Sequence, residues 1–216
     1  MYIDNSSYQS QARPLIVGIG GTPRAASTSE RALQACLAHA RKLGAETRIF
    51  VGEDLDLPMY RPGATASDPK ADAMVEALRN CDGLIIASPS YHGSISGMLK
   101  NALDYTEDLR EDQRPYLDTR PVGCIVCSAG WQAVGTTLTA MRSIVHALRG
   151  WPSPLGVGFN TIDPVFDAQA ALSIEDPAPP LVALAEQVVG FANRFEKSPA
   201  FQKFAAAPDV LHDRAS

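Results

Sequence analysis

The chain has 216 residues, of which 45% are hydrophobic and 20% are charged, and its formal net charge is −5. A chain of this length can bury one sizeable core without metal ions or disulfides, which excludes extensive disorder, and its scattered glycines and prolines exclude collagen-like or linker-like chains. The mild acidity and the lack of any Lys/Arg run argue against a nucleic-acid-binding protein, which usually carries a basic stripe.

The two ends of the chain differ in pattern from its middle. Residues 1–14 are polar and lack the apolar segment of a signal peptide, so we expect a loose N-terminal arm. Residues 15–197 should form one domain, followed by a C-terminal tail at residues 198–216. The aromatic residues of this tail are Phe201 and Phe204, and we expect the tail either to pack on a partner subunit or to fray. No apolar run approaches the roughly 18 residues that span a bilayer, so we expect no membrane association and a cytoplasmic location.

Five short apolar segments rich in Val and Ile alternate with segments of helical pattern. Most of the apolar segments are continuous, as parallel strands covered on both faces require. The predicted strands are residues 15–19, 48–51, 83–87, 122–127 and 155–159. The predicted helices lie around residues 33–43, 69–78, 96–105, 138–148 and 181–195. This alternation predicts an α/β fold with a doubly wound five-stranded parallel sheet and helices on both faces.

Local signals set several of the expected helix boundaries. Gly44 should follow the end of the first helix, and Gly150 should close the fourth in the same way. Asp68 and Pro69 form an N-cap and N1 pair for the second helix. Residues 163–180 contain several prolines, so we expect them to be irregular.

The chain contains four cysteines, two of which form the spacing C-x-x-C at Cys124 and Cys127. This spacing is known from redox motifs. Both cysteines lie in a predicted strand, however, where residues three apart face opposite sides of the sheet. We therefore favour buried strand thiols, which suits a reducing compartment.

The loop after the first strand has the composition of an anion site. In an open parallel sheet ligands bind outside the carboxyl ends of the strands. Here the loop offers the Thr22, Ser27 and Ser29 hydroxyls and the Arg24 guanidinium, and it leads into a helix N-terminus, which favours an anion. The sequence therefore predicts a site for one terminal phosphate. The alternative is that the serines only cap the helix.

Known nucleotide motifs do not explain this loop. Gly18-x-Gly20 begins like a dinucleotide fingerprint, but its third glycine would fall on Pro23. The Gly-Lys-Ser/Thr of a P-loop is absent from the sequence.

The segment after the third strand carries a family resemblance. Residues 89–104 read Pro-Ser-Tyr-His-Gly-Ser-Ile-Ser-Gly-Met-Leu-Lys-Asn-Ala-Leu-Asp. This run closely resembles the P-x-Y-x-G-S-x-x-G-x-L-K-N-x-x-D signature of the NAD(P)H-dependent FMN reductase family, which has a flavodoxin-like fold. Residues 20–27 resemble the same family's G-S-x-R-x-x-S phosphate loop, with Thr22 at the usual serine. The resemblance covers roughly residues 15–160.

The resemblance implies a binding role for three loops. The first would hold the FMN phosphate, the second would line the isoalloxazine ring largely through backbone N–H groups, and the third would lie beside the pyrimidine side of the flavin. The implied cofactor-binding residues are Thr22, Arg24, Ser27 and Ser29 in the first loop, Pro89, Ser90, Tyr91, His92, Gly93 and Ser94 in the second, and Ser128, Gly130 and Trp131 in the third.

Several of these positions keep alternatives. Relatives commonly have Asn at the position of His92, which either reaches the flavin or is a solvated or structural residue. Gly93 would let the backbone approach the flat ring. Trp131 stands where relatives commonly have a small residue. Three roles are open for it: to narrow the nicotinamide pocket, to cover the flavin edge, or to pack as an ordinary side chain at the rim.

Charged residues outside the three loops are weaker candidates. We expect Lys100, Asn101 and Asp104 to support the second loop structurally. Arg110 and Arg114 are candidates for the 2′-phosphate of NADPH, although a solvated charged segment is the favoured interpretation.

The implied function is NAD(P)H-dependent FMN reduction, with FMN and either NADPH or NADH as cofactors. Hydride transfer between stacked rings needs no acid–base pair from the protein, so we assign no catalytic side chain and no metal site. Reduced flavin would go to a monooxygenase, or FMN would stay bound and reduce a quinone, azo dye or chromate. A non-enzymatic FMN electron carrier is the alternative from another class. The resemblance also implies a homodimer or homotetramer.

Overall fold

The computed structural model describes residues 13–63 and 68–196. The expected arm up to residue 12, and the tail with Phe201 and Phe204, lie outside the described residues. Within the described ranges no helix is long and apolar enough to cross a bilayer. The elements in chain order are β1 (Leu15–Gly20), α1 (Thr28–Lys42), β2 (Glu46–Phe50), η1 (Gly52–Leu55), α2 (Pro69–Asn80), β3 (Gly83–Pro89), α3 (Gly97–Asp104), η2 (Tyr105–Leu109), β4 (Pro121–Ser128), α4 (Trp131–Ala147), β5 (Trp151–Asn160), α5 (Ala168–Ala171) and α6 (Pro179–Glu196).

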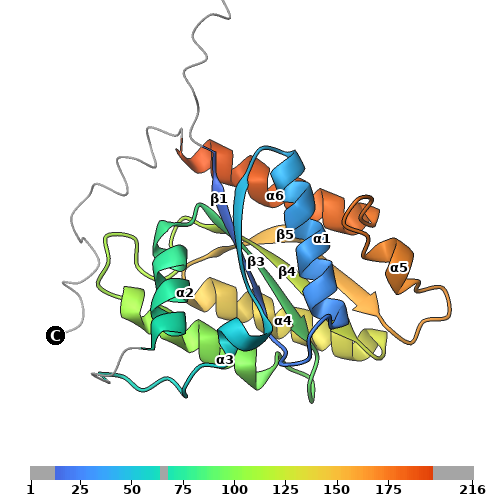
Figure 1. Ribbon diagram of the computed structural model, residues 1–216, viewed down its shortest axis with the longest axis horizontal. Helices are drawn as coiled ribbons and strands as arrows, with labels where there is room; N and C mark the ends of the chain where they lie inside the picture. The colour runs from blue at the N-terminus through green and yellow to red at the C-terminus, as the bar shows by residue number, and fades with distance from the viewer. Residues whose placement is uncertain (1–12, 64–67, 197–216) are drawn as a thin grey trace, which may run out of the picture.

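The five strands form one parallel sheet in the order β2-β1-β3-β4-β5 (Figure 1). This is the strand order of flavodoxin-like folds, so the predicted α/β fold is confirmed. The inner strands β1, β3 and β4 are almost wholly buried, whereas the edge strand β5 is half-buried and begins earlier than predicted, at Trp151. It contains Pro152 and Pro154, which an edge strand tolerates because only one side carries ladder bonds.

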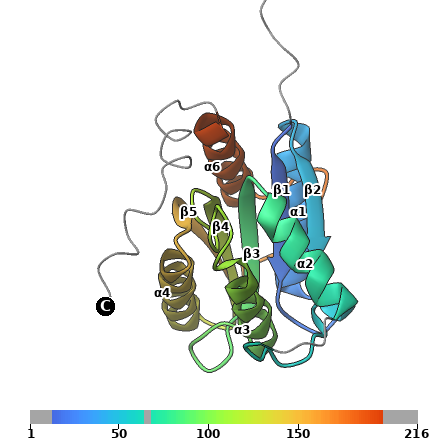
Figure 2. The ribbon, with the colours of Figure 1, turned by 90° about the vertical axis from the view of Figure 1, so that its left-hand side faces the viewer.

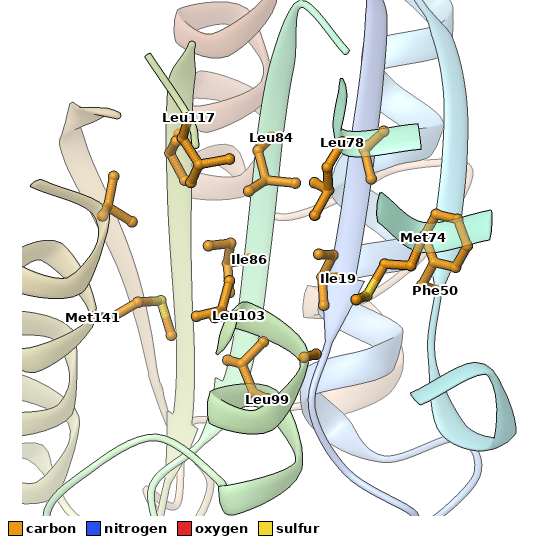
Figure 3. Packing of buried hydrophobic residues seen from close by; sticks show 14 of the residues in the cluster. Ile19, Phe50, Met74, Leu78, Leu84, Ile86, Leu99, Leu103, Leu117 and Met141 are labelled. Carbon is orange, nitrogen blue, oxygen red and sulfur yellow. The ribbon is translucent and has the colours of Figure 1, made fainter. Parts of the chain in front are cut away.

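Helices cover both faces of the sheet (Figures 1 and 2). Buried side chains of α1 and α6 pack on one face, and those of α2, α3 and α4 pack on the other. Figure 3 shows part of the core between the sheet and α2, α3 and α4, where strand residues meet apolar side chains from these three helices. The labelled residues include Ile19, Leu84 and Ile86 from strands and Met74, Leu78, Leu99, Leu103 and Met141 from helices.

The predicted helix signals were correct at α1 and α2 and wrong at α4. Gly44 follows α1 with a φ of 92°. Asp68 accepts hydrogen bonds from two N–H groups of the first turn of α2. After α4, however, Arg149 takes the left-handed conformation with a φ of 63°, and Gly150 does not. Gly150 is instead crowded, because a Cβ there would lie 3.0 Å from the side chain of Val145.

The segment 163–180 is only partly irregular, which corrects the prediction. It contains the short helix α5, for which Asp167 is the N-cap and accepts a hydrogen bond from the Gln169 N–H at 2.8 Å. The Ala168 carbonyl accepts a bond from the Arg31 guanidinium at 2.8 Å, which ties this segment to α1.

The four cysteines are buried and free. Cys124 belongs to the core on the side of α2, α3 and α4, whereas Cys127 belongs to the core on the side of α1 and α6. The two thiols therefore lie on opposite faces of the sheet, as the strand periodicity predicts. Because the sheet separates them, the C-x-x-C spacing does not form a redox pair.

Candidate functional site

A cavity of about 560 Å³ lies at the carboxyl ends of the strands, within the size range of small-molecule sites. It is formed by three loops, the first (residues 20–29), the second (residues 89–94) and the third (residues 128–133), and by the end of β5. Its wall consists of Thr22, Arg24, Ser27, Thr28, Ser29, Pro89, Ser90, Tyr91, His92, Gly93, Cys127, Ser128, Ala129, Ala133 and Thr161.

The first loop gathers hydroxyl groups at the N-terminus of α1. Thr22, Ser27 and Ser29 are all buried and line the cavity. The Ser27 hydroxyl accepts a hydrogen bond from the Glu30 N–H at 3.2 Å and lies 3.3 Å from the Ser29 hydroxyl. Ser27 therefore caps the helix and also faces the cavity, so the capping and ligand-binding interpretations are compatible. The first N–H groups of α1 have no partner within the helix and add donors.

The charges of this loop favour an anion. Arg24 lines the cavity from an exposed position, and no carboxylate within residues 13–63 and 68–196 forms an ion pair with it. The nearby carboxylate of Glu30 accepts bonds from the Ala26 N–H at 2.9 Å and the Gln34 amide at 3.1 Å. A guanidinium, three hydroxyls and a helix N-terminus together suit a phosphate group.

The second loop contains a tight hairpin turn. The backbones of Tyr91 and Ser94 exchange two hydrogen bonds, of 2.9 and 3.1 Å. Between them, His92 and Gly93 have φ values of 53° and 81°, which corresponds to a type I′ turn. His and Asn are enriched among the residues that adopt positive φ, so the turn itself gives His92 a structural reason. Gly93 has room for a Cβ, whose nearest contact would be 3.8 Å away, so its positive φ favours glycine more than crowding does.

Hydrogen bonds fix the second loop to β4 and α4. The Ser90 N–H donates to the Cys127 carbonyl at 3.2 Å, and the Ser90 hydroxyl lies 2.7 Å from that of the buried Thr137. Pro89, Ser90, Tyr91, His92 and Gly93 all line the cavity, whereas Ser94 closes the turn outside the wall.

The third loop is held by β5. Gly130, with a φ of 107°, precedes α4 and donates its N–H to the Asn160 side-chain oxygen at 2.7 Å, so this N–H already has a partner within the protein. Ser128 lines the cavity. Trp131 lies outside the wall with 59% of its surface exposed, and its ring approaches Gly158 on β5. Its position is therefore that of a rim side chain packed beside the edge strand.

The end of β5 supplies residues that the sequence analysis missed. Thr161 lines the cavity, and its N–H donates to the Ser128 carbonyl at 2.8 Å. Asn160 accepts hydrogen bonds from both Gly130 and Ile162. The rule that ligands bind at the carboxyl ends of parallel strands applies to β5 as well, so it would have predicted these residues at the end of that strand.

The structure does not bring the two candidate NADPH-binding arginines to the cavity. Arg110 pairs with Glu107 at 3.6 Å and Glu111 at 3.2 Å. Arg114 is half-buried and donates to the Thr119 hydroxyl at 3.2 Å. Both precede β4, near its amino end, whereas the cavity lies at the carboxyl ends. The expectation of a solvated charged segment therefore fits Arg110, and Arg114 has a structural partner.

The polar side chains of α3 have structural partners, but these partners lie in α3 and in residues 57–60 and not in the second loop, which corrects the expectation that they support that loop. Lys100 and Asp104 form an exposed ion pair at 2.5 Å. The Asn101 amide donates to the Pro58 carbonyl at 2.9 Å and accepts from the Tyr60 N–H at 2.8 Å, which holds residues 58–60 against α3.

The cavity wall offers binding groups more than reactive ones. Burial raises the pKa of the Cys127 thiol to about 12, so this group is protonated at neutral pH and is a poor nucleophile. No group of three or more His, Cys, Asp or Glu side chains in the described part of the chain is arranged to hold a metal ion. The site thus suits a phosphorylated ligand that carries its own reactivity.

Comparison with known proteins agrees with this chemistry. The model of the family described as NADPH-dependent FMN reductase matches residues 14–161. An FMN-dependent NADPH-azoreductase of Staphylococcus aureus (strain USA300) is 30% identical over 165 residues, which cover 72% of this chain and 82% of that protein.

Solved structures share the fold at lower identity. The apo form of an NADH:FMN oxidoreductase, EMOB, superposes with a TM-score of 0.61 at 22% identity, covering 87% of this chain and 93% of that one. FerB, an NAD(P)H:(acceptor) oxidoreductase from Paracoccus denitrificans, has a TM-score of 0.63 at 17% identity, covering 84% and 98%.

Proposed function

Because this chain belongs to the NADPH-dependent FMN reductase family and is an NAD(P)H-dependent flavin oxidoreductase, we propose that FMN binds in the cavity at the carboxyl ends of the strands. Its phosphate would lie in the first loop and its ring along the second and third loops. The observation that carries this proposal is the cavity wall itself, where buried hydroxyls and a helix N-terminus at the first loop continue into the backbone turn at His92 and Gly93.

The donor set at this cavity fits FMN. Thr22, Ser27, Ser29 and Arg24 would hold the phosphate, and the backbone around Gly93 would lie against the ring. When bound, FMN supplies the two-electron chemistry by accepting hydride from a nicotinamide ring. The protein's part is to bind, to orient the two rings and to exclude water, because the transfer needs no proton donor from the chain.

We propose that FMN stays bound and that electrons pass to a small-molecule acceptor such as an azo compound or a quinone. The name of the Staphylococcus aureus relative, an FMN-dependent azoreductase, supports this acceptor class. A second candidate is release of reduced flavin to a monooxygenase. The exposure of Arg24 and of Tyr91, 51% of whose surface is accessible, supports it, because an exposed site lets a ligand leave. A non-enzymatic carrier is not proposed, because the family is one of reductases.

Anaerobic oxidation of NADH and NADPH by the purified protein separates these candidates. With retained FMN, an azo dye or quinone should support turnover without added flavin. With released FMN, turnover should depend saturably on free FMN. Absence of oxidation with every acceptor would contradict the proposed function.

Cytoplasmic location and a homodimeric or homotetrameric state remain part of the proposal. Large exposed apolar side chains at the start of α4 and in the segment after β5, among them Trp131, Ile162 and Val165, support self-association. Gel filtration should show an oligomer, and a monomer at micromolar concentration would contradict this part.

A further inference from the structure

Ser96 lies between the first and second loops and is not part of the cavity wall. It is the N-cap of α3, and only 2% of its surface is exposed. Its hydroxyl lies 2.5 Å from the Gly21 carbonyl and 3.1 Å from the Leu99 N–H. Because the Leu99 N–H can only donate, the Ser96 hydroxyl accepts that bond and must donate its own proton to Gly21.

The backbone of Ser96 extends the same network to the second loop. Its N–H donates to the Ser88 hydroxyl at 3.0 Å, and that hydroxyl donates to the Pro89 carbonyl at 2.7 Å. Each of these hydrogen bonds has one possible direction. The Ser96 hydroxyl donates to Gly21 in the first loop, and the Ser96 N–H donates to Ser88, which donates to Pro89 in the second loop. A buried network in which every group is satisfied holds its members in one arrangement.

Close packing around Gly21 makes this connection stiff. A Cβ at Gly21 would lie 2.3 Å from the Leu99 Cβ and 2.6 Å from the Ser96 hydroxyl, so only glycine fits between the first loop and α3. The Gly21 N–H also donates to the Ala87 carbonyl at 3.0 Å. Gly21 directly precedes Thr22, so this contact fixes the backbone next to the Thr22 hydroxyl, which lines the cavity.

We propose that Ser96 is a positioning residue that sets the first loop relative to the second, and so places the phosphate site at the correct distance from the ring site. The proposal rests on the proposed binding of FMN in this cavity. It assigns Ser96 a role beyond helix capping: loss of its hydroxyl should disturb the phosphate site more than the ring site.

The test compares binding of FMN and of riboflavin, which lacks the phosphate, by the full-length protein freed of bound flavin. Flavin fluorescence gives both dissociation constants. Ser96→Ala and Ser96→Gly should each weaken FMN binding by about tenfold, because a buried carbonyl loses a hydrogen bond, and should leave riboflavin binding within about twofold. Glycine is itself a fair N-cap, so Ser96→Gly separates the Gly21 bond from loss of the cap.

Two further variants serve as controls. Ser88→Ala removes the link to the second loop only, so it should weaken FMN and riboflavin binding by similar factors. Asp68→Ala removes the N-cap of α2, which is not part of the cavity wall, and should lower thermal stability without changing either dissociation constant.

The outcomes distinguish the two proposals. If the wild-type protein binds FMN and riboflavin equally, the phosphate assignment in the first loop fails. If the wild-type protein prefers FMN and both Ser96 variants keep that preference, Ser96 is only a helix cap and does not position the first loop.

Discussion

Arg24 lines the cavity from an exposed position, so water and salt screen its interaction with a phosphate. We expect Arg24→Ala to weaken FMN binding by about 1.5 kcal/mol, the lower end for a hydrogen bond to a charged group. Riboflavin binding should not change. Titration of the protein with FMN and with riboflavin at two salt concentrations measures the change in each dissociation constant and its dependence on salt. Arg110→Ala, which removes a guanidinium outside the cavity wall, is the control. An unchanged FMN dissociation constant would show that Arg24 is only a surface charge.

His92 occupies a backbone conformation that few residue types adopt readily. Its φ of 53° in the type I′ turn is tolerated by Asn and Gly but disfavoured for a β-branched side chain. We therefore expect His92→Asn to bind FMN like the wild type. His92→Val should lose about 1–2 kcal/mol of stability, measured by urea unfolding, and bind FMN more weakly. If the valine variant matches the asparagine variant in both measurements, the turn does not limit this position.

At the scale of elements, a buried arginine connects α2 to the segment before β4. Arg120 is fully buried, and its guanidinium donates to the carbonyls of Arg79, Cys81, Tyr116 and Asp118, at 2.7 to 3.3 Å. These acceptors come from the end of α2 and from the loop after η2. The network lies at the amino ends of the strands, so it stabilises the fold on the side away from the cavity.

Arg120→Met should therefore separate stability from binding. The methionine would leave several carbonyls without their donor, so we expect a loss of about 3 kcal/mol or more in the free energy of unfolding. FMN affinity of the folded variant should stay within about twofold, since no group of the cavity changes. Arg110→Ala removes an exposed guanidinium of the same segment and should change stability by less than about 0.5 kcal/mol. Similar losses in the two variants would contradict the assigned role of Arg120.

At the scale of the whole molecule, the buried cysteines make stability depend on pH. Burial raises the pKa of Cys36, Cys124 and Cys127 to about 12, well above the ordinary thiol value. Above that ordinary value the unfolded chain loses thiol protons that the folded chain keeps. The free energy of unfolding should therefore fall as pH rises toward 12, by up to about 1.4 kcal/mol per pH unit for each thiol. Below the ordinary value these thiols add no pH dependence.

Urea unfolding between about pH 8 and pH 11 tests this expectation. Other groups also titrate there, so the comparison is between the slopes of the wild type and of Cys36→Ala, not between their absolute stabilities. The variant should have the smaller slope because it has one buried thiol fewer. Equal slopes would show that the Cys36 thiol ionises equally in the folded and unfolded chains.

Much of the fold could be predicted because its signals are local. Apolar periodicity predicted the five parallel strands and the helices, and the Asp68-Pro69 pair marked the start of α2. Errors arose where a local signal had two physical causes. Gly150 suggested a helix end, but Arg149 takes the left-handed position there, and Gly150 is needed for close packing instead.

The candidate site, like the fold, could be predicted only where its signals are local. The sequence alone determined which loops carry hydroxyls, glycines and an arginine at strand ends, because these depend on residues adjacent in the chain. Only the tertiary structure decided that Thr161 completes the cavity wall, that Asn160 takes the Gly130 N–H, and that Ser96 connects both ligand loops. The bonds from Gly130 to Asn160 and from Ser96 to Gly21 join residues 30 and 75 positions apart in the sequence. Their geometry is set by the packing of α3 and β5 on the sheet, which no local pattern encodes.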